Sequence, residues 1–283
     1  MLNKVEFWLA ENDYGHIVRQ EPVDGGCINN ASRLHLDKGR TLFLKYSDKA
    51  PDNMFLTEVE GLEALRQADA LRIPKVIHAE EDFLILEDLG QGEPVQDYWE
   101  QLGKGLAKIH ETQGQQYGFF TDNYCGSTRQ VNDLTFNGFE FFAAYRILTL
   151  ATAAAQRGLL EADDVIALDS IAMNLSSWIP IQAAVLIHGD LWSGNVHCDQ
   201  FGQPALIDPA PYWGWAEAEL AMTKLFGGFP DRFYDSYAEH GDLESDWLER
   251  APLYNLYHLL NHLLLFGESY LPQIRSITDR FAS

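Results

Sequence analysis

The chain has 283 residues, enough to bury a sizeable core, and carries a formal net charge of −22 with an isoelectric point near 4.6. This acidity argues against binding to nucleic acid or to an anionic membrane surface, because both need clustered cations. The chain has three cysteines, no leader-like segment after Met1 and no apolar run as long as a membrane span. We therefore expect a soluble, cytoplasmic protein.

The N-terminal region predicts three antiparallel strands, at residues 21–23, 32–36 and 41–46. Glycine lets a backbone approach a phosphate group closely, so Gly25 and Gly26 in the first turn are predicted to bind a nucleotide through their amides. The thiol of Cys27, in the same turn, has two interpretations. It is an ordinary reduced thiol, or it forms an intermolecular disulfide under oxidation and gives a redox-linked dimer. The oligomeric state is otherwise open.

A helix is predicted from about residue 54 to residue 68, after the third strand. Glu58 shares the apolar face of this helix, and a buried carboxylate needs a partner. Lys45, near the end of the third strand, is the predicted partner, in an ion pair that would direct the lysine toward the phosphates of a nucleotide. Glu60 lies about 200° further round the helix and should face solvent.

Residues 83–86 predict a central strand, and the linker after it is expected to separate a lobe of residues 1–90 from a lobe of residues 91–283. Kinase-like folds bind adenine through backbone groups at such a linker, so Leu89 is predicted to contact adenine. Beyond the linker the apolar spacing is close to 3.6 residues, which predicts a helical lobe. The expected helices span residues 98–110, 139–157, 163–178, 216–226, 232–237, 252–266 and 271–281.

Three polar residues carry the main functional signal. Asp190 and Asn195 are five residues apart on a predicted loop, and Asp208 ends a later apolar strand. Protein kinases space their catalytic-loop Asp and their metal-holding Asn by the same interval, with a second metal-binding Asp further on. We therefore predict that Asp190 is the catalytic base, and that Asn195 and Asp208 bind Mg²⁺ between the phosphates of ATP.

Two short strands are expected to hold this motif, at residues 184–187 and 205–207, with turn residues at 199–204 that favour a hairpin-like arrangement. The predicted fold is α+β and bilobal, with a small antiparallel-sheet N-terminal lobe and a larger, mainly helical C-terminal lobe, as in protein kinases. Only seven residues separate Asp208 from the helix expected near Ala216. This is too short for the long activation segment of many protein kinases.

Together with these residues, several motifs resemble the fructosamine kinase (ketosamine-3-kinase) family of aminoglycoside-phosphotransferase-like enzymes. The motifs are HGDLWSGN at 188–195, DPA at 208–210, EAELAM at 217–222, FGGF at 226–229, LYHLLNH at 256–262, GGCIN at 25–29, DNYCG at 122–126, and Met54, Phe55, Glu58 and Gly61. The chain departs from the family at Glu219, where many relatives have Asp, and at Ser193, where many have Gly. The roles of these two residues are therefore open.

The resemblance implies ATP-dependent phosphorylation of the 3-hydroxyl of a ketosamine, free or protein-bound, and release of the amine from the unstable product. It implies that Lys45 and Glu58 orient the nucleotide. It also implies that Trp192 stacks on the sugar, although a core tryptophan that anchors the loop is the other interpretation. His258 and His262 could bind a metal, but among leucines they are expected to line the acceptor groove or to pack through hydrogen bonds.

Three other functions remain open. A kinase for an aminoglycoside, choline or homoserine would keep every ATP residue and change only the groove. A non-catalytic ATP-binding protein would lack a base or a metal ligand, and none is lost here. A metal-dependent hydrolase using His188, Asp190 and Asp208 would leave Lys45 and Glu58 unexplained.

Overall fold

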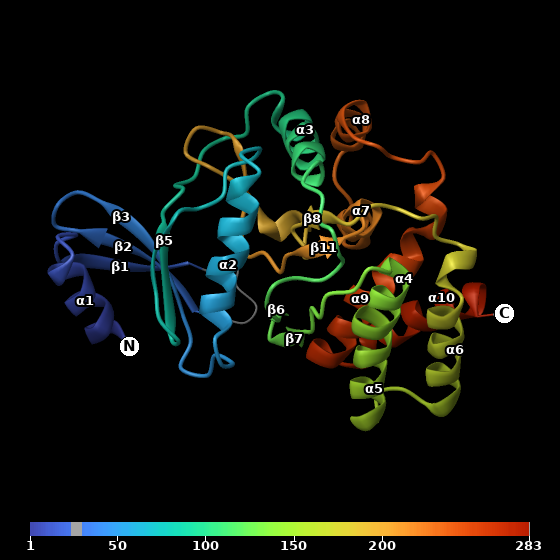
Figure 1. The fold of residues 1–283 in the computed structure, drawn as a ribbon. Helices are drawn as coiled ribbons and strands as arrows, with labels where there is room; N and C mark the ends of the chain where they lie inside the picture. Colours follow the sequence, from blue (N-terminus) through green and yellow to red (C-terminus); the bar gives the residue numbers. More distant parts are fainter. Residues whose placement is uncertain (24–29, 283) are drawn as a thin grey trace.

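The computed structural model describes residues 1–23 and 30–282, so Gly25, Gly26 and Cys27 lie outside the described residues. Its main sheet has five antiparallel strands in the order β1-β2-β3-β5-β4 (Figure 1). These strands are β1 (Ile17–Val23), β2 (Asn30–Leu36), β3 (Thr41–Tyr46), β4 (Val76–Ala79) and β5 (Phe83–Glu87). The three predicted N-terminal strands and the central strand are confirmed, and β4 is an addition.

One helix covers each face of this sheet. Helix α1 (Leu2–Glu11), which the apolar spacing did not predict, packs Val5 and Leu9 against alternate residues of β2, β3 and β5. Helix α2 (Met54–Gln67) covers the other face and packs beside β5 (Figure 1). Its buried apolar residues belong to a core that continues into the C-terminal half of the chain. The predicted face of α2 is therefore confirmed, and Glu60 is exposed as expected.

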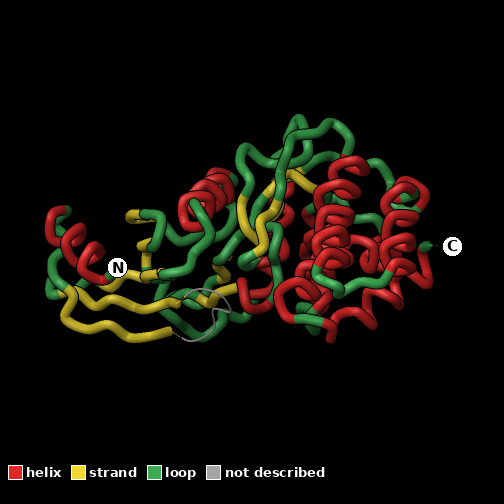
Figure 2. Tube along the Cα trace, turned by 90° about the horizontal axis from the view of Figure 1, so that it is seen from below, coloured by secondary structure: helices red, strands yellow, loops and turns green. Residues whose placement is uncertain are grey.

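The C-terminal half is mainly helical, and Figure 2 shows its helices gathered at the end of the molecule opposite the larger sheet. The helical elements are α3 (Tyr98–His110), α4 (Gly138–Phe141), the π-helix η1 (Phe142–Leu148), α5 (Thr149–Gln156), α6 (Ala162–Met173), α7 (Ala216–Leu225), α8 (Asp231–His240), α9 (Trp247–Phe266) and α10 (Leu271–Phe281), with short 3₁₀ turns at Leu175–Ser177, Ser193–Asn195 and Glu268–Tyr270. Among the described residues no helix combines the length and apolarity needed to cross a membrane.

The larger sheet ends at Glu87 and α3 begins at Tyr98, so we propose residue 90 as the boundary between the lobes.

Two helix predictions need correction. Helix α9 begins at Trp247, five residues before the predicted start, and Pro252 lies inside it. Proline favours the first turn of a helix, which explains the late prediction. The segment predicted as one helix from 139 to 157 changes to π-helical hydrogen bonding between Phe142 and Leu148. A single inserted residue in the hydrogen-bond pattern leaves no clear mark on the apolar spacing.

The hairpin-like pairing of residues 184–187 with 205–207 is wrong. Strand β8 (Val185–Ile187) pairs with β11 (Tyr212–Gly214), whereas β10 (Pro204–Leu206) pairs with β9 (Val196–Cys198). The turn at 199–204 was placed correctly, but its first strand is β9. Three-residue strands carry too little alternation to reveal their partners, which depend on tertiary packing. A further small hairpin joins β6 (Asn123–Cys125) to β7 (Thr128–Gln130).

Helix α2 contacts the C-terminal lobe through a glycine. A Cβ added at Gly61 would lie 2.8 Å from Cδ and 2.9 Å from Cγ of Pro211. Those distances are too short for carbon atoms, and a proline ring cannot rotate away. The absence of a side chain at Gly61 therefore allows α2 to lie against the segment that follows β10.

We predict that Gly61→Ala lowers the free energy of unfolding by up to about 2 kcal/mol. Helix propensity alone would favour alanine by about 1 kcal/mol, but overpacking costs roughly 1–3 kcal/mol and displaces α2 from Pro211. Urea denaturation of the two proteins measures this change. Glu63→Ala is the matched control, because Glu63 is exposed on the same helix. A Gly61→Ala protein more stable than the parent would contradict the packing argument.

Candidate active site

Lys45 lies at the centre of the ionic contacts that join the two lobes. Its Nζ donates to Glu58 Oε1 at 2.6 Å and to Asp208 Oδ1 at 3.0 Å. The lysine and glutamate side chains are only 8% and 10% exposed, whereas Asp208 is 44% exposed. Burial lowers the pKa of Lys45, but the two carboxylates outweigh it and hold that pKa above its usual range. The predicted ion pair is confirmed, and the lysine stays charged.

Asp208 has an unusual backbone. Its φ of 54° is left-handed, which costs energy in a residue other than glycine and is further disfavoured before a proline. Neighbouring hydrogen bonds hold this conformation: the amide of Ile207 donates to Asn195 O at 3.1 Å, and that of Ala210 donates to His188 O at 2.9 Å. The strained turn directs the Asp208 carboxylate toward Lys45.

A buried polar network from the β6–β7 hairpin supports the same segment. Gln130 donates to Ala210 O at 2.9 Å, and Asn123 donates to Pro211 O at 2.8 Å. Tyr257, on α9, donates to Gln130 at 2.5 Å. These residues had no predicted role. The DNYCG motif was a signal for the hairpin, but its contact with residues 210–211 depends on the fold.

The loop after β8, which carries the predicted catalytic base, is held by its own side chains. His188 is fully buried, and burial lowers its pKa, so its imidazole is neutral. Its Nε2 donates to Ile207 O at 2.9 Å, and its Nδ1 accepts from the Asp190 amide at 3.3 Å. Asn195 Nδ2 donates to Asp190 O at 2.7 Å and lies 3.3 Å from Asp190 Oδ2. The five-residue spacing therefore brings the predicted base and the predicted amide ligand into contact.

Glu219 braces this loop from α7. Its Oε2 accepts from the amide of His188 at 2.7 Å, and its Oε1 accepts from the amide of Gly189 at 2.9 Å. His110 also lies 3.3 Å from this carboxylate. Burial raises the pKa of Glu219, but these hydrogen bonds and nearby His188 outweigh it, so the net shift is downward and the group is ionised. This contact answers the open question about Glu219.

Asp190 lies where its charge is unfavourable. Burial, reinforced by the charge of Asp208, raises its pKa to about 7. Its carboxylate also lies next to the thiol of Cys125 and 3.9 Å from Nδ1 of His258. Burial lowers the pKa of His258 to about 3, so its imidazole is neutral. A carboxylate with this environment can accept a proton near neutral pH.

The remaining predicted residues take varied positions. Trp192 is half-buried and meets the ring of Phe226 edge-on, with centroids 6.3 Å apart. His258 lies beside Asp190, whereas His262 Nδ1 donates to the carbonyl of His258 at 2.7 Å, which excludes that nitrogen as a metal ligand. Leu89 is buried, and its carbonyl accepts from the Gln200 amide at 2.9 Å.

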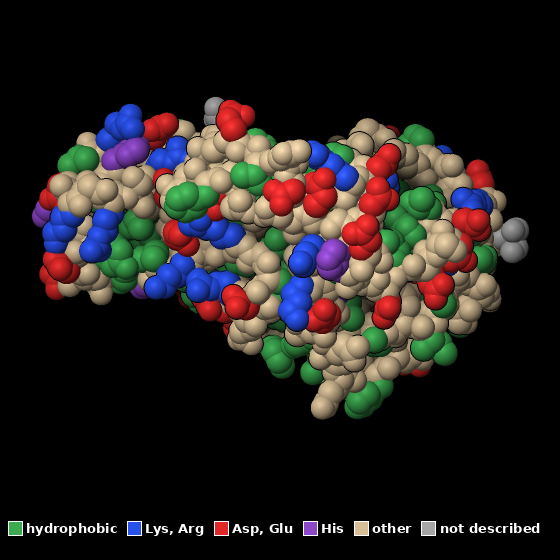
Figure 3. Space-filling model, turned by 90° about the horizontal axis from the view of Figure 1, so that it is seen from above, with side chains coloured by type: hydrophobic (Ala, Val, Ile, Leu, Met, Phe, Trp, Pro, Cys, Tyr) green, Lys and Arg blue, Asp and Glu red, His purple; other side chains and the backbone are tan. Residues whose placement is uncertain are grey.

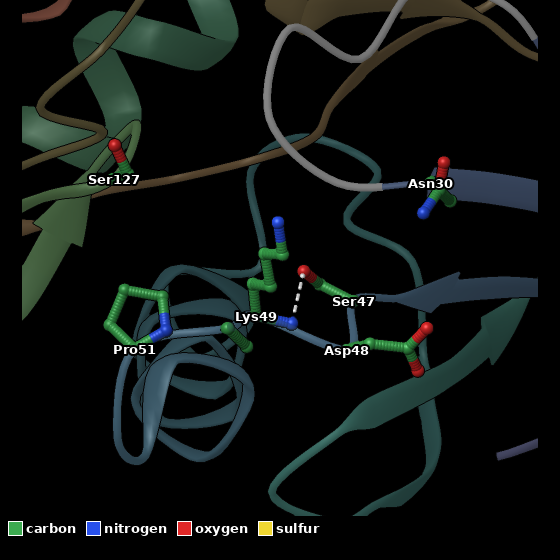
Figure 4. A pocket seen from close by; sticks show the side chains of 7 residues that line it. Asn30, Ser47, Asp48, Lys49, Pro51 and Ser127 are labelled. Carbon is green, nitrogen blue, oxygen red and sulfur yellow. Dashed lines mark hydrogen bonds between the residues drawn. The ribbon is translucent and has the colours of Figure 1, made fainter.

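A pocket of about 370 Å³ opens beside the junction of the lobes (Figure 4). Its lining comes from the start of β2, the turn after β3 and the turn of the β6–β7 hairpin: Asn30, Ser47, Asp48, Lys49, Ala50, Pro51 and Ser127. The amide of Lys49 donates to Ser47 Oγ at 3.2 Å across its floor. The pocket thus adjoins the end of the strand that carries Lys45.

Comparison with known proteins agrees with this geometry. The family model described as fructosamine kinase matches residues 1–283. A probable ketoamine kinase of Synechocystis is 38% identical over 266 residues, which cover 92% of this chain and 89% of the relative. A chloroplastic protein-ribulosamine 3-kinase of Oryza sativa subsp. indica is 34% identical over 285 residues, which cover 96% of this chain and 81% of the relative.

A solved structure from Thermobifida fusca, named for fructosamine-3-kinase, superposes with a TM-score of 0.88 at 32% identity and covers 99% of this chain and 98% of its own. The match extends over both lobes and confirms the predicted α+β, kinase-like fold. With the family model matching the whole length, the chain belongs to the fructosamine kinase family.

Proposed function

We propose that this protein transfers the γ-phosphoryl group of ATP to the 3-hydroxyl of a ketosamine. The observation that carries the proposal is the convergence of Lys45, Asp190 and Asp208 at one site, with the lysine bonded to Asp208 at 3.0 Å. A positioned base beside a lysine and metal-binding oxygens is the arrangement of a phosphotransferase. The ketoamine kinase and ribulosamine 3-kinase among the relatives supply the acceptor class.

Oxygen atoms available at the site suit Mg²⁺. Asn195 uses its Nδ2 to bond Asp190, which leaves its Oδ1 as an acceptor, and Asp208 presents a carboxylate that is 44% exposed. Carboxylate and amide oxygens are the ligands that Mg²⁺ prefers. We therefore assign Asn195 and Asp208 as its protein ligands. When bound, Mg²⁺ supplies positive charge beside the transferring phosphoryl group.

The residues of the chain then divide the reaction between them. Lys45, oriented by Glu58, binds the phosphates, and Asp190 aligns the acceptor hydroxyl and takes its proton. The bond from the sugar oxygen to the γ-phosphorus forms as the bond to the β–γ bridging oxygen breaks, and ADP leaves. We assign the amides of Gly25 and Gly26 to the phosphates of the nucleotide. We assign the N–H of Leu89 to adenine, because the carbonyl of Leu89 already accepts from the Gln200 amide.

The acceptor is assigned to the side of Asp190 that faces His258, with Trp192, two residues further along the loop, as a second contact. Trp192 is half-buried and presents an apolar ring for the sugar, and the neutral imidazole of His258 can accept a hydrogen bond from a hydroxyl. A row of acidic side chains lies on the C-terminal lobe (Figure 3). The chain as a whole carries a net charge of −22. This charge favours cationic, amine-bearing acceptors, whether free or protein-bound.

We predict that Asp190→Asn reduces phosphoryl transfer by about 10²–10⁴-fold, the usual contribution of a general base. The amide keeps the shape of the side chain but cannot take the proton. ADP release measures the rate, and calorimetric titration with ATP should show affinity within a few-fold of the parent. Normal turnover by this variant would remove Asp190 from its role.

We predict that Glu219→Gln lowers kcat by roughly 10–100-fold while ATP affinity changes little. The amide group would place a donor against one loop N–H, and a buried unpaired N–H costs about 1–3 kcal/mol. Steady-state kinetics and ATP titration separate the two quantities. Glu111→Gln is the control, since Glu111 is exposed. Equal losses of kcat and ATP affinity would argue for general unfolding and against loop positioning.

The acceptor class is tested by a substrate panel. We expect ADP release with fructosamines, ribulosamines or erythrulosamines, free or on a glycated protein, and none above background with an aminoglycoside, choline or homoserine. The phosphorylated product should then lose its amine, which mass spectrometry detects. Turnover of only a control compound would overturn the ketosamine assignment while leaving the kinase class intact.

A further inference from the structure

Three side chains of different chemistry meet at the base. Cys125 Sγ, a carboxylate oxygen of Asp190 and an imidazole nitrogen of His258 all lie within 4.8 Å of one another. They come from β6, the catalytic loop and α9. Thiolate, carboxylate and imidazole are the groups that bind zinc in proteins, and three such ligands with an open fourth position are common.

His258 provides the second observation. Its Nδ1 is buried and has no hydrogen-bond partner among the described residues, and it lies 3.9 Å from Asp190 Oδ1. The residue is only 4% exposed. Buried polar atoms in proteins are nearly always hydrogen-bonded. A buried imidazole nitrogen without a partner, beside a carboxylate and a thiol, offers a position for a cation.

The two oxygens of Asp190 face different groups. Oδ2 lies 3.3 Å from Asn195 Nδ2, on the side assigned to Mg²⁺, whereas Oδ1 faces His258. The cluster with Cys125 is therefore separate from the pair formed by Asn195 and Asp208. A soft thiol and an imidazole suit zinc better than magnesium, which prefers oxygen.

We propose that Cys125, Asp190 and His258 form a zinc-binding site that inhibits the enzyme by occupying its base. Zinc bonds of about 2.0–2.3 Å place tetrahedral ligands roughly 3.3–3.7 Å apart, so small side-chain rotations suffice. Binding releases the thiol proton of Cys125 to solvent. Thiolate and carboxylate then balance the charge of Zn²⁺, which limits the cost of burial.

The route to this site is the acceptor side. The Asp190 side chain is 19% exposed, whereas Cys125 and His258 are buried beneath it. Zinc would therefore compete with the acceptor hydroxyl for Asp190 and leave the nucleotide site free. Inhibition rests on the proposed kinase function, but metal binding does not.

Direct binding is measured with Co²⁺, a coloured substitute for zinc, on the full chain without nucleotide. All proteins carry Cys27→Ser, which removes the thiol next to Gly25 and Gly26 in the sequence. We expect a thiolate-to-cobalt absorption band that stoichiometric Zn²⁺ abolishes. Cys125→Ser should remove the absorption band. His258→Gln should raise the Kd for Co²⁺ at least about 100-fold, which is the upper range for loss of a contact that supports a metal ligand.

Cys198→Ser is the matched control, because Cys198 is the other described cysteine and lies outside the cluster. The cobalt absorption band of Cys198→Ser should have the same intensity as that of the parent. The proposal is overturned if the parent shows no band, if the band survives Cys125→Ser, or if Cys198→Ser removes it. Should Cys125→Ser fail to fold, His258→Gln decides the question, and an unchanged Kd in that folded variant overturns the site.

Kinetics test the inhibition. Added Zn²⁺ should raise KM for the ketosamine without changing KM for MgATP, and a zinc-selective chelator should restore the rate. Cys125→Ser should need at least about tenfold more Zn²⁺ for the same inhibition. Equal sensitivity of the two proteins would overturn the inhibitory role. A protein that binds Co²⁺ through Cys125 but phosphorylates no ketosamine would refute the proposed function and leave the zinc site standing.

Discussion

The ammonium group of Lys45 is the contact on which the site depends, because it bonds a carboxylate from each half of the chain. Glu58 is 13 residues away in the sequence and Asp208 is 163 residues away. The side chain is almost completely buried, so losing either carboxylate would leave a poorly compensated charge. The position of α2 against the segment after β10, which Gly61 makes possible, therefore also sets the distance between Glu58 and Asp208.

Helix α7 contributes a second constraint through two buried acids in its first turn, where the helix dipole favours negative charge. Glu219 faces the loop that carries Asp190 and accepts hydrogen bonds from two of its amides. Glu217 faces the opposite way and binds Arg250 of α9 through two hydrogen bonds of 2.6 Å. One helical turn thus fixes the loop to α7 and α7 to α9, so the loop geometry is determined by the packing of the whole C-terminal lobe.

Much of this site could be predicted where periodicity and spacing carry the signal. Glu58 stood out as a charged residue on an apolar helix face, and the interval from Asp190 to Asn195 marked the loop. The pairing of β8 with β11 and the contact of Gln130 with Ala210 could not be predicted, because strands of three residues have no alternation to read and their partners lie far away in the sequence. The position of Cys125 beside Asp190 could not be predicted for the same reason.

The environment of Asp190 follows from these constraints together. The amides of Gly189 and Asp190 donate to Glu219 and His188, and Asn195 Nδ2 donates to Asp190 O. The backbone that carries the carboxylate is therefore held on both sides. Lys45 keeps Asp208 close, and the charge of Asp208 adds to the effect of burial, which raises the pKa of Asp190. Asp190 is therefore a constrained group whose pKa is raised first by burial and then by the charge of Asp208, which the ion contacts between the lobes hold in place. Any cation that enters the site, bound to nucleotide or held by Cys125 and His258, must change that pKa.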